Sequence, residues 1–179
     1  VLGMTELLLN TNLSNKQQHL ADIIHRSGLN LLDLINDILD LSKIDAGKLE
    51  LNNASHDLRL LIEDVADTFS ERANSKGLEL TCIYPSSQHA LFQCDRQRLT
   101  QILTNLVGNA IKFTDNGAVT IHVSVASQSD SEQCLRIEVL DTGVGIADDV
   151  LPRLFSRFTQ ADSSTTRKFG GTGLGLAIC

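Results

Sequence analysis

The sequence has few of the features that mark nucleic-acid-binding proteins. It contains no tryptophan, and no run of basic residues has aromatic residues between them. Lys and Arg number 15 against 22 Asp and Glu, which gives a formal net charge of -7 at neutral pH. Because an acidic chain repels the phosphate backbone, we expect no nucleic acid among its partners.

The sequence also lacks the patterns of a metal-binding, disulfide-bonded or membrane-spanning protein. Its four cysteines form no CxxC pair, and no histidine lies at metal-ligand spacing from any of them. Such cysteines are usually small buried hydrophobic residues in a reducing compartment. No apolar run reaches the roughly 18 residues of a membrane span, and there is no signal peptide. These absences say nothing about the intact protein. We expect this chain to be cytoplasmic and to contact a membrane only through segments absent from it.

What the sequence does contain is enough apolar material for a packed core, since 42% of its residues are hydrophobic. The chain begins with Val1-Leu2-Gly3-Met4-Thr5, already in an apolar helical pattern, and ends as abruptly at Cys179. We expect both ends to be cuts through structure.

The first third of the chain predicts a helical hairpin. An apolar helix is expected over residues 1–9. Ser14, with Gln17 three residues later, predicts the capping box of a long helix that runs to about Lys43. In that helix apolar residues recur alternately four and three positions apart, as in a coiled-coil seam. They are Leu20, Ile24, Leu31, Leu34, Ile38 and Leu41, with Ser27 filling the gap between Ile24 and Leu31, and with Leu32, Ile35 and Leu39 widening the stripe.

So wide an apolar stripe suits a four-helix bundle. One short and one long helix cannot build four, so a symmetric homodimer of hairpins over residues 1–49 is the economical solution. The alternative is a hairpin that packs against its own second domain.

Residues 50–179 predict an α/β sandwich. Asp57 is suited to cap a helix, and a further helix from about Arg96 to Phe113 has an almost perfect 3.6-residue apolar pattern. A strand is expected from Leu78 to Tyr84, and a β-hairpin around the polar loop Ser127 to Gln133. Strands and helices mix without strict alternation, so we expect an α+β fold whose mixed, mainly antiparallel sheet has helices on one face.

Three elements of this second part carry residues whose chemistry is suited to binding a ligand. The first is on the Arg96–Phe113 helix, where Asn105, Asn109 and Lys112 share the face opposite the apolar stripe. Amide oxygens can ligate Mg²⁺, and an ammonium group can meet a phosphate. Taken alone, such a triplet is more often a solvated helix face.

The other two elements are rich in glycine. Asp141-Thr142-Gly143-Val144-Gly145-Ile146 follows a strand; its glycines permit close approach of a ligand, and its Asp can accept a hydrogen bond from an amine. A tight turn with an Asp cap is the alternative. Gly170 to Gly175 opens an apolar helical run, as phosphate-binding loops do. It is no Walker A loop, and no strand directly precedes it as in a Rossmann turn. The polar segment 162–167 between the two elements has the composition of a mobile flap.

Together these elements resemble the boxes of sensor histidine kinases of the hybrid type. Asn-Leu-Val-Gly-Asn-Ala-Ile-Lys-Phe-Thr, which ends at Thr114, resembles the N box, and Asp141 to Ile146 resembles the G1 box. Leu154 to Phe158 resembles the F box, Gly171 to Gly175 the G2 box, and Leu41 to Lys48 the exit from the dimerisation hairpin. All occur in the family's order, and the resemblance covers nearly the whole chain.

The resemblance implies a Bergerat ATP-binding fold with ATP and Mg²⁺ as cofactors. By position, Asn109 would hold Mg²⁺ with Asn105 beside it, and Lys112 would contact phosphate. Asp141 would read the adenine amine, and Gly143 and Gly145 would shape the adenine pocket. The lid hinge and phosphate contacts would come from Gly171, Thr172, Gly173, Leu174 and Gly175, while Phe155 and Phe158 would pack the lid.

The implied activity is transfer of the ATP γ-phosphoryl group to a histidine, and from there to an Asp of a response-regulator receiver domain. The family's phosphoacceptor histidine is expected just before Val1, and the ATP-binding domain is expected to be cut at Cys179. His56 imitates an H box in Ser-His-Asp-Leu-Arg, but Leu-Leu follows where the family has Thr-Pro, so we expect no acceptor within this chain. Any anchor of the intact protein in the bacterial inner membrane would lie elsewhere.

Two alternatives are weighed against the kinase. ATP hydrolases of the same superfamily carry a Glu one turn before the metal-binding Asn to activate water. Here that position is Asn105, and an amide cannot act as a general base. The other alternative is a non-catalytic dimeric signalling scaffold, against which the intact Asn109, Lys112 and Asp141 argue.

Overall fold

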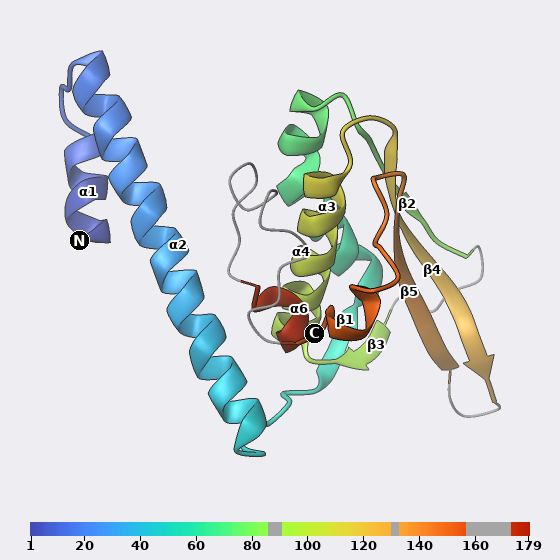
Figure 1. Ribbon diagram of the computed structural model, residues 1–179. Coiled ribbons are helices and arrows are strands. Elements are labelled where there is room, and N and C mark those ends of the chain that lie inside the picture. Colours follow the sequence, from blue (N-terminus) through green and yellow to red (C-terminus); the bar gives the residue numbers. More distant parts are fainter. Residues whose placement is uncertain (86–90, 130–132, 157–172) are drawn as a thin grey trace. The chain divides into compact units, whose positions relative to one another are not determined.

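The structure of this chain, a computed structural model, describes residues 1–85, 91–129, 133–156 and 173–179. The chain divides into two units, whose main bodies are Val1–Leu49 and Glu50–Ala177 (Figure 1). No helix among the described residues is both long and apolar enough to cross a membrane.

The first unit is the predicted helical hairpin, made of α1 (Leu2–Leu9) and α2 (Asn15–Asp45). The capping box at the start of α2 is confirmed: the backbone N–H of Gln17 donates to Ser14 Oγ (3.4 Å), and that of Ser14 donates to Gln17 Oε1 (2.9 Å). The helix continues two residues beyond the predicted Lys43. It stops before Gly47, whose φ of 62° lies in the left-handed region that glycine adopts without strain.

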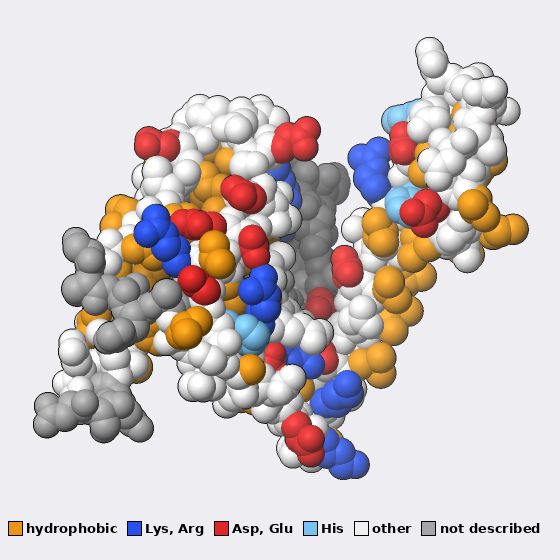
Figure 2. Space-filling view, turned by 180° about the vertical axis from the view of Figure 1, so that it is seen from behind, with side chains coloured by type: hydrophobic (Ala, Val, Ile, Leu, Met, Phe, Trp, Pro, Cys, Tyr) orange, Lys and Arg blue, Asp and Glu red, His pale blue; other side chains and the backbone are white. Residues whose placement is uncertain are grey.

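Within one chain, most of the apolar stripe of α2 is uncovered. Leu20, Ile24 and Leu31 are each at least half exposed, whereas Ala21 and Leu41 are buried. Figure 2 shows hydrophobic side chains gathered along the hairpin. Patches of this kind on a surface mark a contact with another molecule.

The second unit is built on a mixed three-stranded sheet in the order β2-β4-β5. The edge strand β2 (Glu79–Ile83) runs parallel to the central strand β4 (Ala118–Gln128), which pairs antiparallel with β5 (Gln133–Asp141). The β-hairpin is as predicted, although β4 and β5 extend into the expected loop at both ends. The mixed sheet is therefore confirmed.

Two long helices cover one face of this sheet, α3 (Leu58–Ser75) and α4 (Arg96–Phe113) (Figure 1). Their apolar faces form the core with alternate residues of β4. The fully buried members include Leu61, Ile62, Leu103, Val107, Ile111, Val119 and Ile121. The other sheet face is mainly polar: the hydroxyl groups of Thr81 and Thr120 lie 3.0 Å apart there, beside the exposed Ile83 and Leu140. Period-2 alternation in β4 thus separates core from solvent.

A second, two-stranded sheet is absent from the sequence prediction. It consists of β1 (Ala54–Asp57) and β3 (Leu91–Cys94), paired antiparallel. Asp57 ends β1 and also caps α3 as predicted, because its Oδ1 accepts from the backbone N–H groups of Arg59 (2.9 Å) and Leu60 (3.1 Å).

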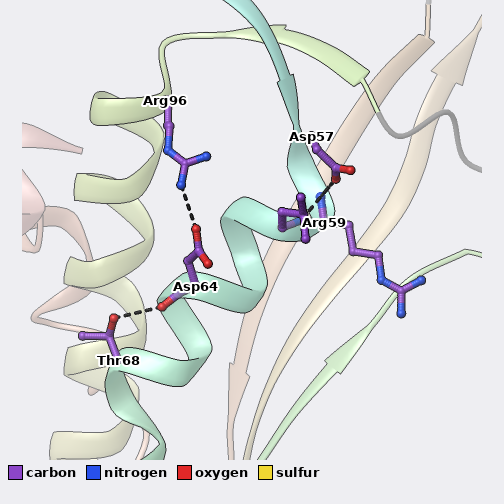
Figure 3. A network of polar contacts seen from close by, with 6 residues as sticks. Asp57, Arg59, Asp64, Thr68 and Arg96 are labelled. Atoms are coloured by element: carbon purple, nitrogen blue, oxygen red, sulfur yellow. Dashed lines mark hydrogen bonds and ion pairs between the residues drawn. The ribbon is translucent and has the colours of Figure 1, made fainter.

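Close by, an ion pair joins α3 to the first turn of α4 (Figure 3). Arg96 Nη2 lies 2.7 Å from Asp64 Oδ2, and both side chains are substantially exposed. Surface pairs of this kind contribute little to stability, so the core sets the packing of the two helices. The remaining elements are a 3₁₀ turn, η1 (Leu151–Arg153), and the short α6 (Gly175–Ile178).

Candidate functional site

The helix α4 carries the first group of predicted site residues. Asp95 starts it, since Asp95 Oδ1 accepts from the backbone N–H of Arg98 (3.0 Å). Its apolar face is buried against α3 and the sheet, which leaves Asn105, Asn109 and Lys112 partly exposed on the other side. The predicted triplet therefore lies on one accessible face, where a ligand can reach it.

The loop after β5 lies directly against the carboxyl end of α4. The backbone N–H of Val144 donates to the carbonyl of Phe113 (3.4 Å). A Cβ atom added to Gly143 would lie only 2.6 Å from that same carbonyl oxygen, so glycine is needed for the approach. The contact brings Asp141, at the end of β5, to the end of the helix that bears Lys112.

Asp141 is held in place by its own loop. The backbone N–H of Gly143 donates to Asp141 Oδ1 (2.8 Å). Thr142 ties the loop to the start of β4, because its Oγ1 accepts from the backbone N–H of Ala118 (3.0 Å). The Asp141 side chain is nevertheless exposed, as a ligand-reading carboxylate must be.

The described part of the last glycine-rich element contacts α4 through Asn105. Asn105 Nδ2 donates to the carbonyl of Gly175 (3.1 Å), and a Cβ atom on Gly175 would lie 3.0 Å from Asn105 Oδ1. Leu174 beside it is completely buried, and Gly173 has a φ of 68°. Gly171, Thr172 and Phe158 lie outside the described residues. Asn105 thus has a positioning contact that the sequence prediction did not include.

The electrostatics of Lys112 suit an anionic ligand. Burial lowers the pKa of Lys112, and the nearby charge of Arg72 lowers it further. Both effects disfavour the ammonium form, so a phosphate group nearby would offset them. The Lys112 ammonium also lies 4.8 Å from the ring centroid of Phe113.

The donor set fits Mg²⁺ bound together with a phosphate rather than in an all-protein cage. Among the described residues no group of three or more His, Cys, Asp or Glu side chains could hold a metal ion. Mg²⁺ is commonly bound by one or two protein oxygens, several waters and substrate phosphates. The amide oxygen of Asn109, on the same face as Lys112, is of the right type for that role.

Comparison with known proteins finds two family models that match this chain. Residues 94–179 match the family described as "Histidine kinase-, DNA gyrase B-, and HSP90-like ATPase". Residues 1–47 match the "His Kinase A (phospho-acceptor) domain". Both matched segments occur in the order that the resemblance implied.

Relatives cover the chain from end to end. "Hybrid signal transduction histidine kinase L" of Dictyostelium discoideum is 46% identical over 100% of this chain and 10% of its own length. "Signal transduction histidine-protein kinase BarA" of Escherichia coli (strain K12) is 44% identical over 99% of this chain and 19% of its own length. This chain therefore spans only a small part of the curated relatives that it matches.

Among solved structures, full-length ShkA in complex with AMPPNP is similar with a TM-score of 0.79 and 39% identity, over 99% of this chain and 36% of that one. The histidine kinase AdeS of Acinetobacter baumannii has the same fold, with a TM-score of 0.68 over 98% of this chain and 76% of that one. The chain belongs to the sensor histidine kinases, and the fold predicted from the resemblance is confirmed.

Proposed function

We propose that this chain is the part of a hybrid sensor histidine kinase that binds Mg²⁺-ATP and phosphorylates a histidine. The observation that carries the proposal is the meeting of three elements along α4: the face of Asn109 and Lys112, the loop of Asp141, and the segment Gly173–Gly175. Support also comes from the matched histidine kinases and from the relative solved in complex with AMPPNP.

Each residue has a separate task in this proposal. Asp141 accepts a hydrogen bond from the exocyclic amine of adenine, in a pocket shaped by Gly143 and Gly145. Asn109 supplies an oxygen to Mg²⁺, which when bound spreads the negative charge of the phosphates. Lys112 meets a phosphate oxygen. Further phosphate contacts come from Gly171, Thr172, Gly173, Leu174 and Gly175. Of these, Gly175 accepts a hydrogen bond from Asn105 on α4.

The transfer itself is an in-line displacement. A histidine ring nitrogen forms a bond to the γ-phosphorus as the bond from that phosphorus to the β,γ-bridging oxygen breaks, and ADP leaves. The accepting histidine lies outside this chain. His56 is unsuited to the role because it belongs to β1, paired with β3, rather than to a helical bundle.

The first unit brings two copies of the chain together. Residues 1–49 form the dimerisation hairpin, and two copies bury the exposed stripe of α2 as a four-helix bundle. Residues 50–179 form the ATP-binding domain. The phosphoryl group then passes to an Asp of a response-regulator receiver domain.

Hydrolysis of ATP as the main activity is disfavoured by the position of Asn105. Its side chain is an amide, and its Nδ2 is engaged with Gly175, so it can neither take a proton from water nor turn toward one without breaking that contact.

Phosphohistidine formation tests the proposal. The full-length protein incubated with γ-labelled ATP and Mg²⁺ should acquire an acid-labile, base-stable label. Asn109→Ala should lose most of the label, whereas Asn74→Ala, at an exposed amide on α3, should keep it. Rapid release of labelled phosphate by a protein that never becomes labelled would refute kinase function and favour hydrolysis.

A further inference from the structure

The carboxyl end of α4 accepts hydrogen bonds from a side chain at the end of another helix, α3. The last carbonyl groups of a helix have no partners within the helix. Here Lys76 Nζ donates to the carbonyls of Ile111 (2.8 Å), Lys112 (3.1 Å) and Thr114 (3.1 Å). Three carbonyl contacts match the three donors of an ammonium group, and its positive charge lies at the negative end of the helix dipole.

Lys76 is itself held at a fixed point by the turn that ends α3. The backbone N–H of Gly77 donates to the carbonyl of Asn74 (2.9 Å), and that of Leu78 donates to the carbonyl of Ala73 (3.0 Å). Gly77 has a φ of 69°, which only glycine adopts readily. Leu78 is buried, so the turn is anchored in the core on its far side. The Lys76 side chain therefore starts from a rigid base.

The segment that Lys76 holds is the junction between the two halves of the proposed nucleotide site. One of its three partners is the backbone carbonyl of Lys112, whose side chain belongs to the phosphate half. The neighbouring Phe113 carbonyl, inside the same turn, receives the loop of Asp141 through Val144, and that loop belongs to the adenine half. A shift of this turn would move both halves relative to each other.

We propose that Lys76 is a positioning residue for nucleotide binding, which sets the distance and orientation between Lys112 and Asp141 by clamping the end of α4. This inference rests on the proposed function, because it assumes that these two side chains contact the same nucleotide. A Lys that only stabilised the helix end would change the folded fraction and nothing else. A clamp also changes which base the site prefers.

The test compares ATP and GTP binding by the full-length protein well below its unfolding temperature. Lys76→Met should weaken ATP binding on the order of tenfold, because misplaced binding groups lose much of their contribution. It should weaken GTP binding less, so the ratio of ATP to GTP affinity falls. Lys76→Arg retains a cation with several donors and should restore part of the ATP affinity and of the ratio.

Two controls separate positioning from stability and from charge. Val65→Ala removes buried core packing from α3 and lowers stability without touching the turn at Lys76; well below its unfolding temperature it should keep both affinities and their ratio close to wild type. Arg136→Met removes an exposed cation on the polar sheet face and should leave both affinities at the wild-type level.

Two results would overturn the role of Lys76 and leave the proposed function intact. One is a folded Lys76→Met protein with ATP affinity within about twofold of wild type. The other is an equal loss of ATP and GTP binding, which a lower folded fraction alone would produce. A wild-type protein that bound no ATP would overturn the proposed function and this inference together.

Discussion

Adding a single methyl group at Gly143 should separate the loop of Asp141 from α4. The new Cβ atom would lie 2.6 Å from the Phe113 carbonyl oxygen, 2.8 Å from Asp141 Oδ1 and 3.0 Å from Thr114 Oγ1. Two of these neighbours cannot move aside easily, since one is backbone and Thr114 is completely buried. The loop must therefore shift, which lengthens or breaks the hydrogen bond from Val144 to Phe113.

The cost of Gly143→Ala follows from overpacking of this kind, about 1–3 kcal/mol. For a domain of this size that is a fall of roughly 3–10 °C in Tm. The same substitution at Gly108, inside α4, should have the opposite sign. Its Cβ atom would lie 3.5 Å from the ring of Phe69, an ordinary contact, and Ala is favoured over Gly in a helix by about 0.5–1 kcal/mol.

Differential scanning calorimetry of the two variants beside wild type measures the contrast. Gly143→Ala should melt below wild type and Gly108→Ala above it. ATP titration should also show weaker binding by Gly143→Ala, because Asp141 moves with its loop. A Gly143→Ala protein with unchanged Tm and unchanged ATP affinity would refute the close packing of this loop on α4.

The helical hairpin and the identity of the acceptor give three further predictions. The double variant Leu31→Asp, Ile38→Asp should sediment as a monomer, because charged side chains on the seam cannot be buried in a dimer. The control Asn36→Asp, on the opposite side of α2, should remain dimeric. A monomeric wild type would contradict dimerisation through this seam. Burial, and then the neighbouring aspartates, raise the pKa of Asp37, so the folded state disfavours its charged form and loses stability as pH rises through that pKa. In urea unfolding, Asp37→Asn should accordingly raise the free energy of unfolding of the hairpin at about pH 7 but not at about pH 3. An equal effect at both pH values would contradict the predicted direction of the pH dependence. The phosphohistidine label of the full-length protein should survive His56→Gln, since His56 lies in β1, and its disappearance would make His56 the acceptor.

Local sequence patterns predicted the elements whose bounds are set by residues close together in the sequence. The bounds of α4 agree with its 3.6-residue apolar spacing, and the capping box fixed the start of α2 at Ser14. The small sheet of β1 and β3 was missed because each strand has only four residues. Ala54–Asp57 lacks apolar alternation, and its partner is distant in the sequence, so only tertiary contacts reveal the pairing.

The site was predictable in its residue types and not in its internal contacts. Asn109, Lys112 and Asp141 stand in motifs whose order resembles a family. The bond from Asn105 to Gly175 joins residues 70 positions apart, which no local pattern encodes. Lys76 was missed for a similar reason. A Lys at the end of a helix usually caps its own helix or is solvated, whereas Lys76, the C-cap residue of α3, caps α4.

The central claim is that Asp141 reads the adenine of an ATP bound along α4. Isothermal titration of the full-length protein with Mg²⁺-ATP, wild type against Asp141→Ala, tests it most directly. Asp141→Ala should bind ATP at least tenfold more weakly, because the hydrogen bond to a charged carboxylate contributes about 1.5–3 kcal/mol. Equal affinity of the two proteins for ATP would contradict the claim and remove Asp141 from the site.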